Sequence, residues 1–546
     1  MLGLRLRKDL WAPLAICLVW PLLIFSVDAS GSFPVNDDWS FGPAVFQLIN
    51  TGHYDRNGFW PMILIGQILW AAPFCLVLGK QYWVLRLSTE ILGLAGVLAV
   101  YAILRFCGAR PWLAFLGALT VMVNPLYLEL SCSYMTDVPF FAAATLSFLA
   151  CLHALRKPTA GAYLLVAVAS VVATSIRQFG VLPPAAFAIA DNLRPGRTGR
   201  RVLVSLLPLA LAVATIVVYS LCKGPALSLP DEYEEATHAL TPFFFQGKYA
   251  YCPYIFLHTL TYAFAFALPF YIAVPPWSAC RRRLILLWTA GSFALTCQLA
   301  AWNMLVGSKG NALTTFGVGP CWMFARGFGL PSLPPAVWFA VTCAALIGSG
   351  WFFRICLSGA RRLARFRLHL SERDRRFHFA LSLCVLLQMT IFASVTLYDR
   401  YFLPFLPPLL VIAADRFRPR EPSPRTALAA VVLCLFAWYS VAATHDYLEW
   451  NRQRWQLVRE LTAKGVSPDD IALEPEFWAT TMVRSVEGLP TLQYYRPATH
   501  RDYIDIAFAE LPGGQVVAAR SFQRWLVPGR AFVYAVRRLQ LVPRTR

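Results

Sequence analysis

The sequence predicts an all-α polytopic membrane bundle of about 13 transmembrane helices. We expect juxtamembrane helices in its first outer loop and a small extracytoplasmic α/β domain at the C-terminus. Of the 546 residues, 58% are hydrophobic and only 14% are charged. The apolar residues gather in runs of about 17 to 25, long enough to cross a bilayer. The links between these runs are short and basic, which is typical of the cytoplasmic loops of membrane proteins.

The length of each apolar run predicts where the spans lie. They cover residues 10–28, 82–104, 112–130, 137–155, 161–176, 178–190, 203–222, 253–275, 284–305, 335–357, 377–396, 400–414 and 426–443. With the N-terminus inside and the C-terminus outside, nearly every Arg and Lys cluster falls on the inner side. Localisation in the cell's inner (plasma) membrane, with multiple passes, is therefore expected.

Two apolar stretches need separate treatment. If residues 61–79 crossed the membrane, the basic links after residue 104 would move to the outer side, so this stretch is predicted to be interfacial or re-entrant. The stretch 161–190 is interrupted by Arg177-Gln178 and has basic links at both ends. Two short helices meeting at an outward-facing Arg177 satisfy the charge rule and avoid a charge in lipid.

The first apolar run follows a basic segment with Arg5, Arg7 and Lys8 and has the look of a signal peptide. It lacks a small-x-small cleavage site and many spans follow it, so we interpret it as a retained signal anchor.

Residues 1–444 are expected to form the transmembrane domain and residues 445–546 the extracytoplasmic domain. In this tail, residues 446–464 have helical periodicity and are followed by strand-like runs at 471–473 and 516–519. A hairpin is predicted around Val527-Pro528-Gly529.

Composition argues against two other classes. The net charge of +20 comes from Arg clusters between apolar runs, so nucleic-acid binding is not expected. The 14 Cys and eight His residues show no metal-ligand spacing, and neither a zinc site nor a disulfide framework is indicated.

The first candidate for a reaction site is the sequence Asn36-Asp37-Asp38, which precedes an amphipathic segment at residues 39–50 that ends at Thr51-Gly52. One of these residues could cap the helix, but capping needs only one side chain. Because there are two adjacent acids, Asp37 and Asp38, a catalytic role for this motif is about as favoured as a capping role.

The second candidate is Thr136-Asp137-Val138-Pro139 at the start of a predicted span. Taken alone, it is what the start of a helix favours. Its predicted position on the same face as the first acidic cluster favours a shared site, where paired carboxylates can serve glycosyl transfer by accepting the proton of an attacking hydroxyl. The aromatic residues predicted on that face, able to stack on a sugar or an acceptor, are Trp39, Tyr54, Trp60 and Tyr134.

Three arginines are candidates for binding a phosphate group. Arg177 interrupts an apolar run and Arg400 begins an outer helix end, where a cation would stabilise a departing phosphate. The alternative for Arg400 is an ion pair with Asp399. Arg86 is either a further member of this group or an interface anchor.

Cofactor evidence is weaker. The acidic run Asp231, Glu232, Glu234 and Glu235 could hold a divalent cation, but a run of acids in a long loop is usually a solvated surface. No metal ligands are assigned and no cofactor is certain, and a divalent cation stays an open alternative.

The ordered set of motifs resembles the C-type membrane glycosyltransferases, which include protein O-mannosyltransferases and the aminoarabinose transferases acting on lipid A. The motifs that carry the resemblance are Asn36-Asp37-Asp38-Trp39, Thr51-Gly52, Leu85-Arg86-Leu87-Ser88, Asn124-Pro125, Met135-Thr136-Asp137-Val138-Pro139 and Arg400-Tyr401-Phe402-Leu403-Pro404. The resemblance spans about residues 1–415, and the tail resembles the terminal region of bacterial relatives.

This resemblance implies a polyprenyl-phosphate-linked sugar donor, an extracytoplasmic acceptor and inversion at the anomeric carbon. The family motif is usually Asp-Glu, so Asp37 takes the Asp position, Asp38 replaces the Glu, and either one is left as the base. Asp137 matches the acid of the second outer loop. The expected reaction is a single displacement with Asp37 or Asp38 as base, Asp137 orienting the acceptor or a cation, and Arg177 or Arg400 offsetting the leaving phosphate.

Two other functional classes are the alternatives. A transporter or lipid-carrier flippase should show two similar halves and broken helices near the midplane, whereas here the halves differ and the acids lie at the membrane edge. The other is a non-catalytic membrane protein whose tail binds a partner; loss of function on removing residues after 446, but not on removing the acids, would favour it.

Overall fold

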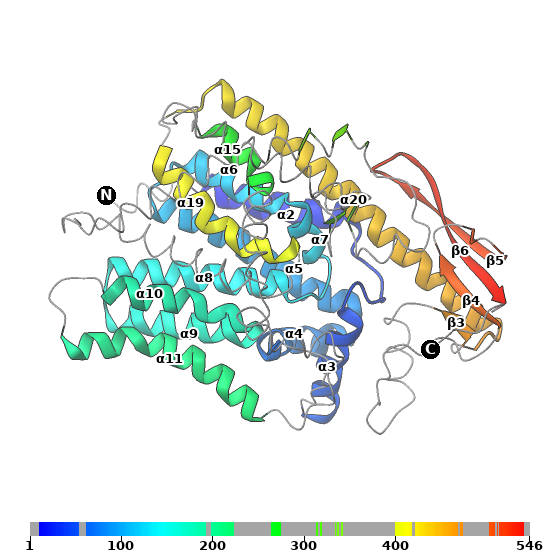
Figure 1. The fold of residues 1–546 in the computed structure, drawn as a ribbon, viewed down its shortest axis with the longest axis horizontal. Coiled ribbons are helices and arrows are strands. Elements are labelled where there is room, and N and C mark those ends of the chain that lie inside the picture. The colour runs from blue at the N-terminus through cyan, green and yellow to red at the C-terminus, as the bar shows by residue number, and fades with distance from the viewer. Residues whose placement is uncertain are drawn as a thin grey trace, which may run out of the picture.

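The computed structural model describes residues 10–53, 62–192, 198–222, 264–274, 399–417, 421–467, 502–507 and 513–539, with shorter pieces at 313–314, 317–318, parts of 334–345, 470–472 and 510–511. These residues form a mostly helical bundle with a small sheet near its C-terminal end (Figure 1).

The bundle is built from helices that lie side by side across Figure 1. Its main helices are α2 (Trp11–Val27), α5 (Tyr82–Phe106), α6 (Pro111–Met122), α8 (Asp137–Arg156), α9 (Ala160–Ile176), α10 (Leu182–Asn192), α11 (Gly199–Cys222) and α20 (Pro424–Ala463). Helices α8, α9, α10 and α11 pack against one another on one side, and α20 runs along the opposite side.

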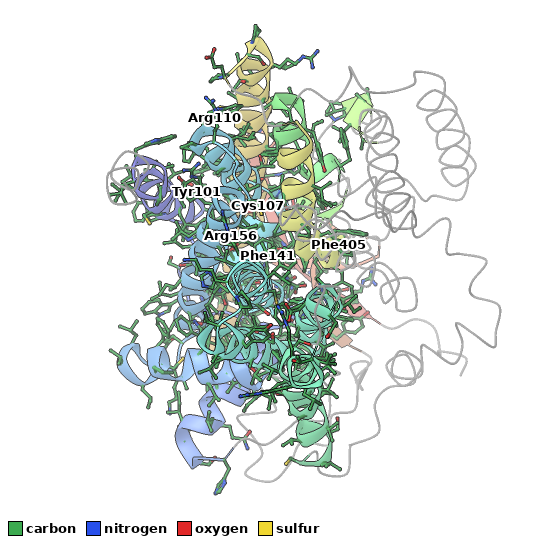
Figure 2. The ribbon with its side chains drawn as sticks, turned by 90° about the vertical axis from the view of Figure 1, so that its left-hand side faces the viewer. Tyr101, Cys107, Arg110, Phe141, Arg156 and Phe405 are labelled. Atoms are coloured by element: carbon green, nitrogen blue, oxygen red, sulfur yellow. The ribbon has the colours of Figure 1, made fainter. Side chains whose placement is uncertain are left out.

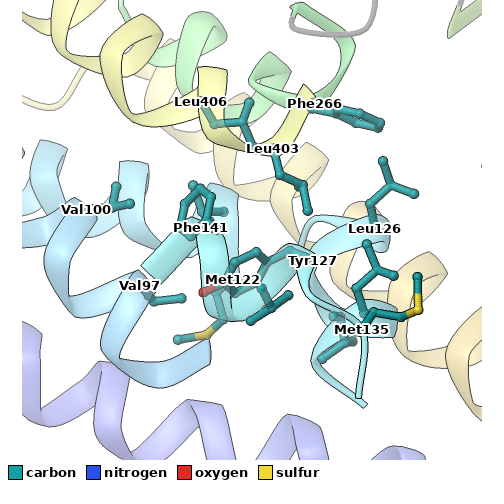
Figure 3. Packing of buried hydrophobic residues seen from close by; sticks show 14 of the residues in the cluster. Val97, Val100, Met122, Leu126, Tyr127, Met135, Phe141, Phe266, Leu403 and Leu406 are labelled. Carbon is teal, nitrogen blue, oxygen red and sulfur yellow. The ribbon is translucent and has the colours of Figure 1, made fainter. Parts of the chain in front are cut away.

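The core lies where side chains of α5, α6 and α8 meet the segment around Leu403. Figure 3 shows side chains from several elements meeting there, including Val100, Met122, Phe141 and Leu403. Phe270 belongs to α15 (Leu268–Ala273), and its side chain is fully buried in the same cluster. Tyr127 stacks edge-on against Phe141 at 5.0 Å and donates a hydrogen bond to the carbonyl of Gly93.

Four of the described helices are long and apolar enough to span a membrane: α5, α8, α11 and α20. A fifth span is formed if the bent pair α6 and α7 counts as one, and α2, α4 and α9 are shorter apolar helices. Much of the surface of α11 is apolar and exposed, with Leu203 71% and Leu221 79% accessible, as expected of a helix that faces lipid. The chain is therefore a multi-pass membrane protein, and the total of 13 spans is not confirmed. The predicted spans 284–305 and 377–396 lie outside the described residues, as do most of 253–275 and 335–357.

One predicted span is broken. Residues 112–130 were expected to form one helix, but α6 ends at Met122 and α7 (Pro125–Ser131) follows at an angle of 63°. Asn124 causes the break, because its side chain accepts hydrogen bonds from the backbone N–H groups of Leu126 and Tyr127 and Pro125 cannot continue the preceding helix.

The predicted interruption at Arg177 is confirmed. Helix α9 ends at Ile176, Arg177 is extended (φ −143°, ψ 142°), and the 3-10 helix η1 (Gln178–Val181) leads into α10. Gly180 makes this tight connection feasible, since a Cβ there would lie 2.2 Å from the backbone nitrogen of Thr174.

The first outer loop leads into two further helices. Helix α3 (Asp38–Thr51) confirms the predicted amphipathic segment, and it ends at Gly52 with a positive φ of 70°. Helix α4 (Ile65–Leu78) lies at the ends of α5 and α9, where Trp70 donates a hydrogen bond to Ser88 O and Gln67 donates one to Tyr134 O. The 3-10 helix η5 (Asp399–Phe405) continues into α19 (Leu406–Phe417).

Basic residues lie at the end of the bundle opposite to α3 and α4. Arg110 precedes α6 and Arg156 ends α8, and both are labelled in Figure 2, which views the bundle from that end. Arg156 donates a 3.4 Å hydrogen bond to Phe106 O and lies over the Phe106 ring. The ends of α5 and α8 therefore meet. This agrees with the prediction that the basic links after these two helices lie on the same side of the membrane.

Helix α20 is a single helix of 40 residues. It therefore runs through the predicted boundary between the two domains, at 444/445. Beyond it, β3 (Ile471–Ala472), β4 (Asp502–Ala507), β5 (Gln515–Arg524) and β6 (Gly529–Leu539) form a sheet in the order β3-β4-β6-β5. The predicted hairpin is β5–β6, and β4 was not predicted. A separate two-stranded piece pairs β1 (Leu313–Thr314) with β2 (Gly317–Val318).

Candidate active site

Asp37 sits at the N-cap of α3, but its side chain makes no capping hydrogen bond. Asn36, the residue before it, has a positive φ of 53°, which asparagine tolerates better than most residues. The Asp37 side chain is 48% exposed. Helix capping therefore does not account for this carboxylate, whose side chain is about half covered by protein and half accessible.

Asp38 has a different environment and is fully buried. Its Oδ2 accepts a hydrogen bond from Val35 N at 3.1 Å, and its Oδ1 accepts one from Tyr134 N at 2.6 Å. Asp38 thus fastens the first outer loop to the turn that precedes α8.

Asp137 is the first residue of α8 and is buried. Its Oδ1 lies 3.0 Å from Nη2 of Arg177. Nε of Arg177 donates a 2.6 Å hydrogen bond to Oγ1 of Thr136, whose side chain makes no capping bond. The planar guanidinium thus contacts two consecutive residues of the second outer loop.

Arg400 brings the two acidic loops together. Its Nη1 lies 3.9 Å from Oδ2 of Asp37, and its Nε lies 3.8 Å from Oδ1 of Asp137. The Tyr401 ring lies beside both guanidinium groups, 5.3 Å from that of Arg177 and 5.7 Å from that of Arg400. Four of the sequence-predicted site residues, from four separate parts of the chain, therefore form one cluster.

The pKa of Asp37 is raised from its ordinary value, chiefly because the surrounding protein desolvates the carboxylate. Arg400 opposes this rise, the like charge of Asp137 adds to it, and Arg177 opposes it more weakly. The carboxylate is therefore more basic than an ordinary aspartate.

Glu129 was missed by the sequence analysis. It lies on α7, is 1% exposed, and its Oε1 accepts a 2.9 Å hydrogen bond from Nδ2 of Asn36. The hydroxyl of Tyr447, on α20, donates a 2.8 Å hydrogen bond to Oδ1 of Asn36. The available signal was a lone acid inside the apolar run Leu126–Leu130, which defaults to a functional hypothesis in a membrane segment.

The contacts of Arg86 are with the start of the first outer loop and not with the cluster formed by Asp37, Asp137, Arg177 and Arg400. Its guanidinium donates hydrogen bonds to the carbonyls of Ala29 (2.7 Å) and Phe33 and packs over the Phe33 ring at 4.4 Å. Arg86 is fully buried and holds the start of the first outer loop against α5.

The two predicted aromatic residues that the structure describes, Trp39 and Tyr134, are both buried. Trp39 is 8% exposed and Tyr134 is fully buried, with its hydroxyl donating to Gln67 O at 3.2 Å. Tyr54 and Trp60 lie outside the described residues, as does the acidic run at 231–235. Within the described part of the chain, no group of three or more His, Cys, Asp or Glu side chains is arranged to hold a metal ion.

The fold and the site define a multi-pass membrane protein with paired carboxylates and paired arginines between its helix ends. Residues 67–221 match the family model described as dolichyl-phosphate-mannose-protein mannosyltransferase. This match confirms the resemblance to the C-type membrane glycosyltransferases over that part of the chain and does not favour the transporter alternative. No curated protein matches the chain.

Several solved structures are similar to this chain at low identity. The Pmt1-Pmt2 protein O-mannosyltransferase complex of S. cerevisiae bound to the sugar donor matches with 18% identity and a TM-score of 0.32, over 39% of this chain and 33% of the yeast chain. ArnT from Cupriavidus metallidurans bound to undecaprenyl phosphate matches with 14% identity and a TM-score of 0.37, over 95% and 97%. The oligosaccharyltransferase AglB from Archaeoglobus fulgidus matches with 14% identity and a TM-score of 0.39, over 83% and 58%. At such low values, no residue role or ligand is transferred from these structures to this chain.

Proposed function

We propose that this protein is an integral membrane glycosyltransferase that moves a sugar from a polyprenyl-phosphate carrier to an extracytoplasmic acceptor, with inversion. The observation that carries the proposal is the bridge made by Arg400 between Asp37 and Asp137. The description of the family that matches residues 67–221 supports the donor class. The acceptor is a glycan, a lipid or a protein.

Asp37 is the proposed base. It is half exposed, its pKa is raised by desolvation, and helix capping does not occupy it. The acceptor hydroxyl oxygen attacks the anomeric carbon and its proton passes to Asp37. The bond between the anomeric carbon and the phosphate oxygen breaks, and its electron pair leaves with the lipid phosphate.

Asp38 is the weaker candidate for the base, although the sequence left the two acids equivalent. Both of its carboxylate oxygens accept backbone hydrogen bonds, and burial keeps an acceptor hydroxyl away from them. We assign to Asp38 and Arg86 the positioning of the first outer loop.

Arg177 and Arg400 are the proposed phosphate partners. Two guanidinium groups near the departing phosphate offset the negative charge that grows as the bond breaks. Asp137 contacts both of them, at 3.0 and 3.8 Å, and so fixes their positions before the donor binds. We propose that Asp137 acts in this way and orients the acceptor.

The proposed setting follows from the sides of the bundle. The cluster lies at the end opposite Arg110 and Arg156, which the positive-inside rule assigns to the cytoplasm. The protein would then lie in the inner (plasma) membrane with a cytoplasmic N-terminus, the transmembrane domain at 1–444 and the C-terminal domain outside.

The function is tested by mass spectrometry of glycolipids and glycoproteins from cells that lack the gene and carry either the natural chain, Asp37→Asn or Asp28→Asn. Asp28 is a matched control, since it lies in the same outer loop, is 54% exposed and pairs with Arg452 at 3.0 Å. We expect a sugar modification that the natural chain and Asp28→Asn restore and Asp37→Asn does not. No difference between cells with and without the gene would contradict the proposal.

A further inference from the structure

Helix α20 marks where the membrane ends. Its 40 residues span about 60 Å, twice the hydrocarbon thickness of a bilayer. The large apolar side chains exposed on it are Leu428, Val431, Leu435 and Trp438, all in its first half. From His445 onward the helix carries charged residues, so its lipid-facing part ends near Trp438–Thr444.

The turn of the β5–β6 hairpin is hydrogen-bonded to α20 just beyond the lipid-facing part of that helix. Oδ1 of Asp446 accepts a 2.7 Å hydrogen bond from Trp525 N, and its Oδ2 accepts a 3.2 Å bond from Leu526 N. The ring of His445 stacks on that of Trp525 with centroids 3.8 Å apart. Figure 1 shows the strands of this hairpin running along the half of α20 that lies beyond the bundle.

The composition of this turn is unusual for one in water. Turns favour Gly, Pro, Asn, Asp and Ser, and Pro528-Gly529 conforms to this, but the three residues before them are the large apolar Trp525, Leu526 and Val527. Trp525 and Val527 are each 42% exposed, and Pro528 is exposed as well. Arg530, also exposed, follows them, where a cation suits anionic lipid headgroups.

We propose that the turn formed by Trp525, Val527 and Pro528 is a membrane anchor that enters the interface of the outer leaflet beside α20. Tryptophan is enriched at this depth because its ring is apolar and its N–H finds polar partners. The exposed apolar side of the first half of α20 faces the bilayer, and the turn lies where that apolar surface ends. The anchor holds the C-terminal sheet against the membrane, and it does not depend on the proposed reaction.

The test places a photoreactive amino acid at Val527 or at Val517 in the full-length protein, reconstituted in phosphatidylcholine and phosphatidylglycerol nanodiscs. Val517 is the matched control, because it is a valine on the same hairpin, 40% exposed, and about 23 Å from the end of its strand at Arg524. We expect irradiation to attach lipid at position 527 at least ten times more often than at 517, with mass spectrometry as the readout.

Equal lipid attachment at both positions, or attachment of position 527 to another part of the chain, would overturn the anchor. If the Val527 variant does not fold, the same substitution at Trp525 replaces it, because that side chain is equally exposed. Sugar transfer is not measured, so this result stays separate from the test of the active site.

Discussion

Nδ2 of Asn36, in the first outer loop, donates a hydrogen bond to Oε1 of Glu129, on α7. Since Tyr447 donates to Oδ1 of the same amide, three parts of the chain meet at the residue that precedes Asp37. This arrangement holds Asn36 in its left-handed conformation and sets the direction of the proposed base.

Glu129→Gln should keep most of the activity, because a glutamine oxygen can still accept the bond from Asn36. Glu129→Leu should lower kcat about tenfold or more with little change in KM, since a buried amide then loses its partner, at a cost of about 1–3 kcal/mol. Steady-state transfer from a polyprenyl-phosphate sugar measures both constants. A Leu variant as active as the natural protein would remove Glu129 from the account.

Tyr447→Phe should lower kcat by about fivefold, because only the hydroxyl donor to Asn36 is lost. Tyr163→Phe is a matched control, since its hydroxyl donates to Asp191, which lies at the other end of the bundle. The same loss of transfer in both variants would indicate general destabilisation instead of positioning.

The rate of transfer should fall as pH decreases through the pKa of Asp37, because the base must be deprotonated. Since desolvation raises that pKa, the fall should begin at a higher pH than for an ordinary aspartate. A pH profile of kcat measures it. A rate that stays constant down to the ordinary pKa of an aspartate would argue against Asp37 as the base.

Arg400→Gln should move the acidic limb of this profile to still higher pH. The cation lowers the pKa of Asp37, so its removal leaves desolvation and the charge of Asp137 less opposed. A limb displaced to lower pH would contradict the bridge between Arg400 and the two acids.

Arg177→Lys should not restore the function of Arg177. The arginine places one nitrogen on Asp137 and another on Thr136, and an ammonium group cannot reproduce this planar pair of contacts. We expect kcat to fall at least tenfold and thermal stability to decrease, because a lysine keeps the charge but leaves Asp137 or Thr136 without its contact from residue 177. Unchanged kcat and melting temperature in the Lys variant would show that the paired geometry is dispensable.

The convergence of the acidic loops could be predicted from the sequence because the membrane fixes which loops share a face. The break at Arg177 was predictable for the same reason, since a charge in lipid is costly. Which acid would be exposed could not be predicted, because the burial of Asp38 depends on a hydrogen bond from Tyr134, far along the chain.

Other features depend on contacts that a single segment does not reveal. Glu129 gains its role only from the approach of Asn36, and α20 continues through residues 444 and 445 because its outer half packs on β5 and the outer loops. The bend at Asn124-Pro125 had a local signal, since Asn caps and Pro at N1 mark a new helix start. This signal was overlooked because the apolar run 112–130 is long enough to form one uninterrupted span.

The most direct test of the active site is the rate of sugar transfer by purified Asp37→Asn, measured with a polyprenyl-phosphate sugar and compared with Asp28→Asn. Losing a general base costs typically 10²–10⁴-fold, so we predict a fall of at least a hundredfold in kcat for Asp37→Asn and less than a twofold change for Asp28→Asn. Equal rates for the two variants would contradict the proposed role of Asp37.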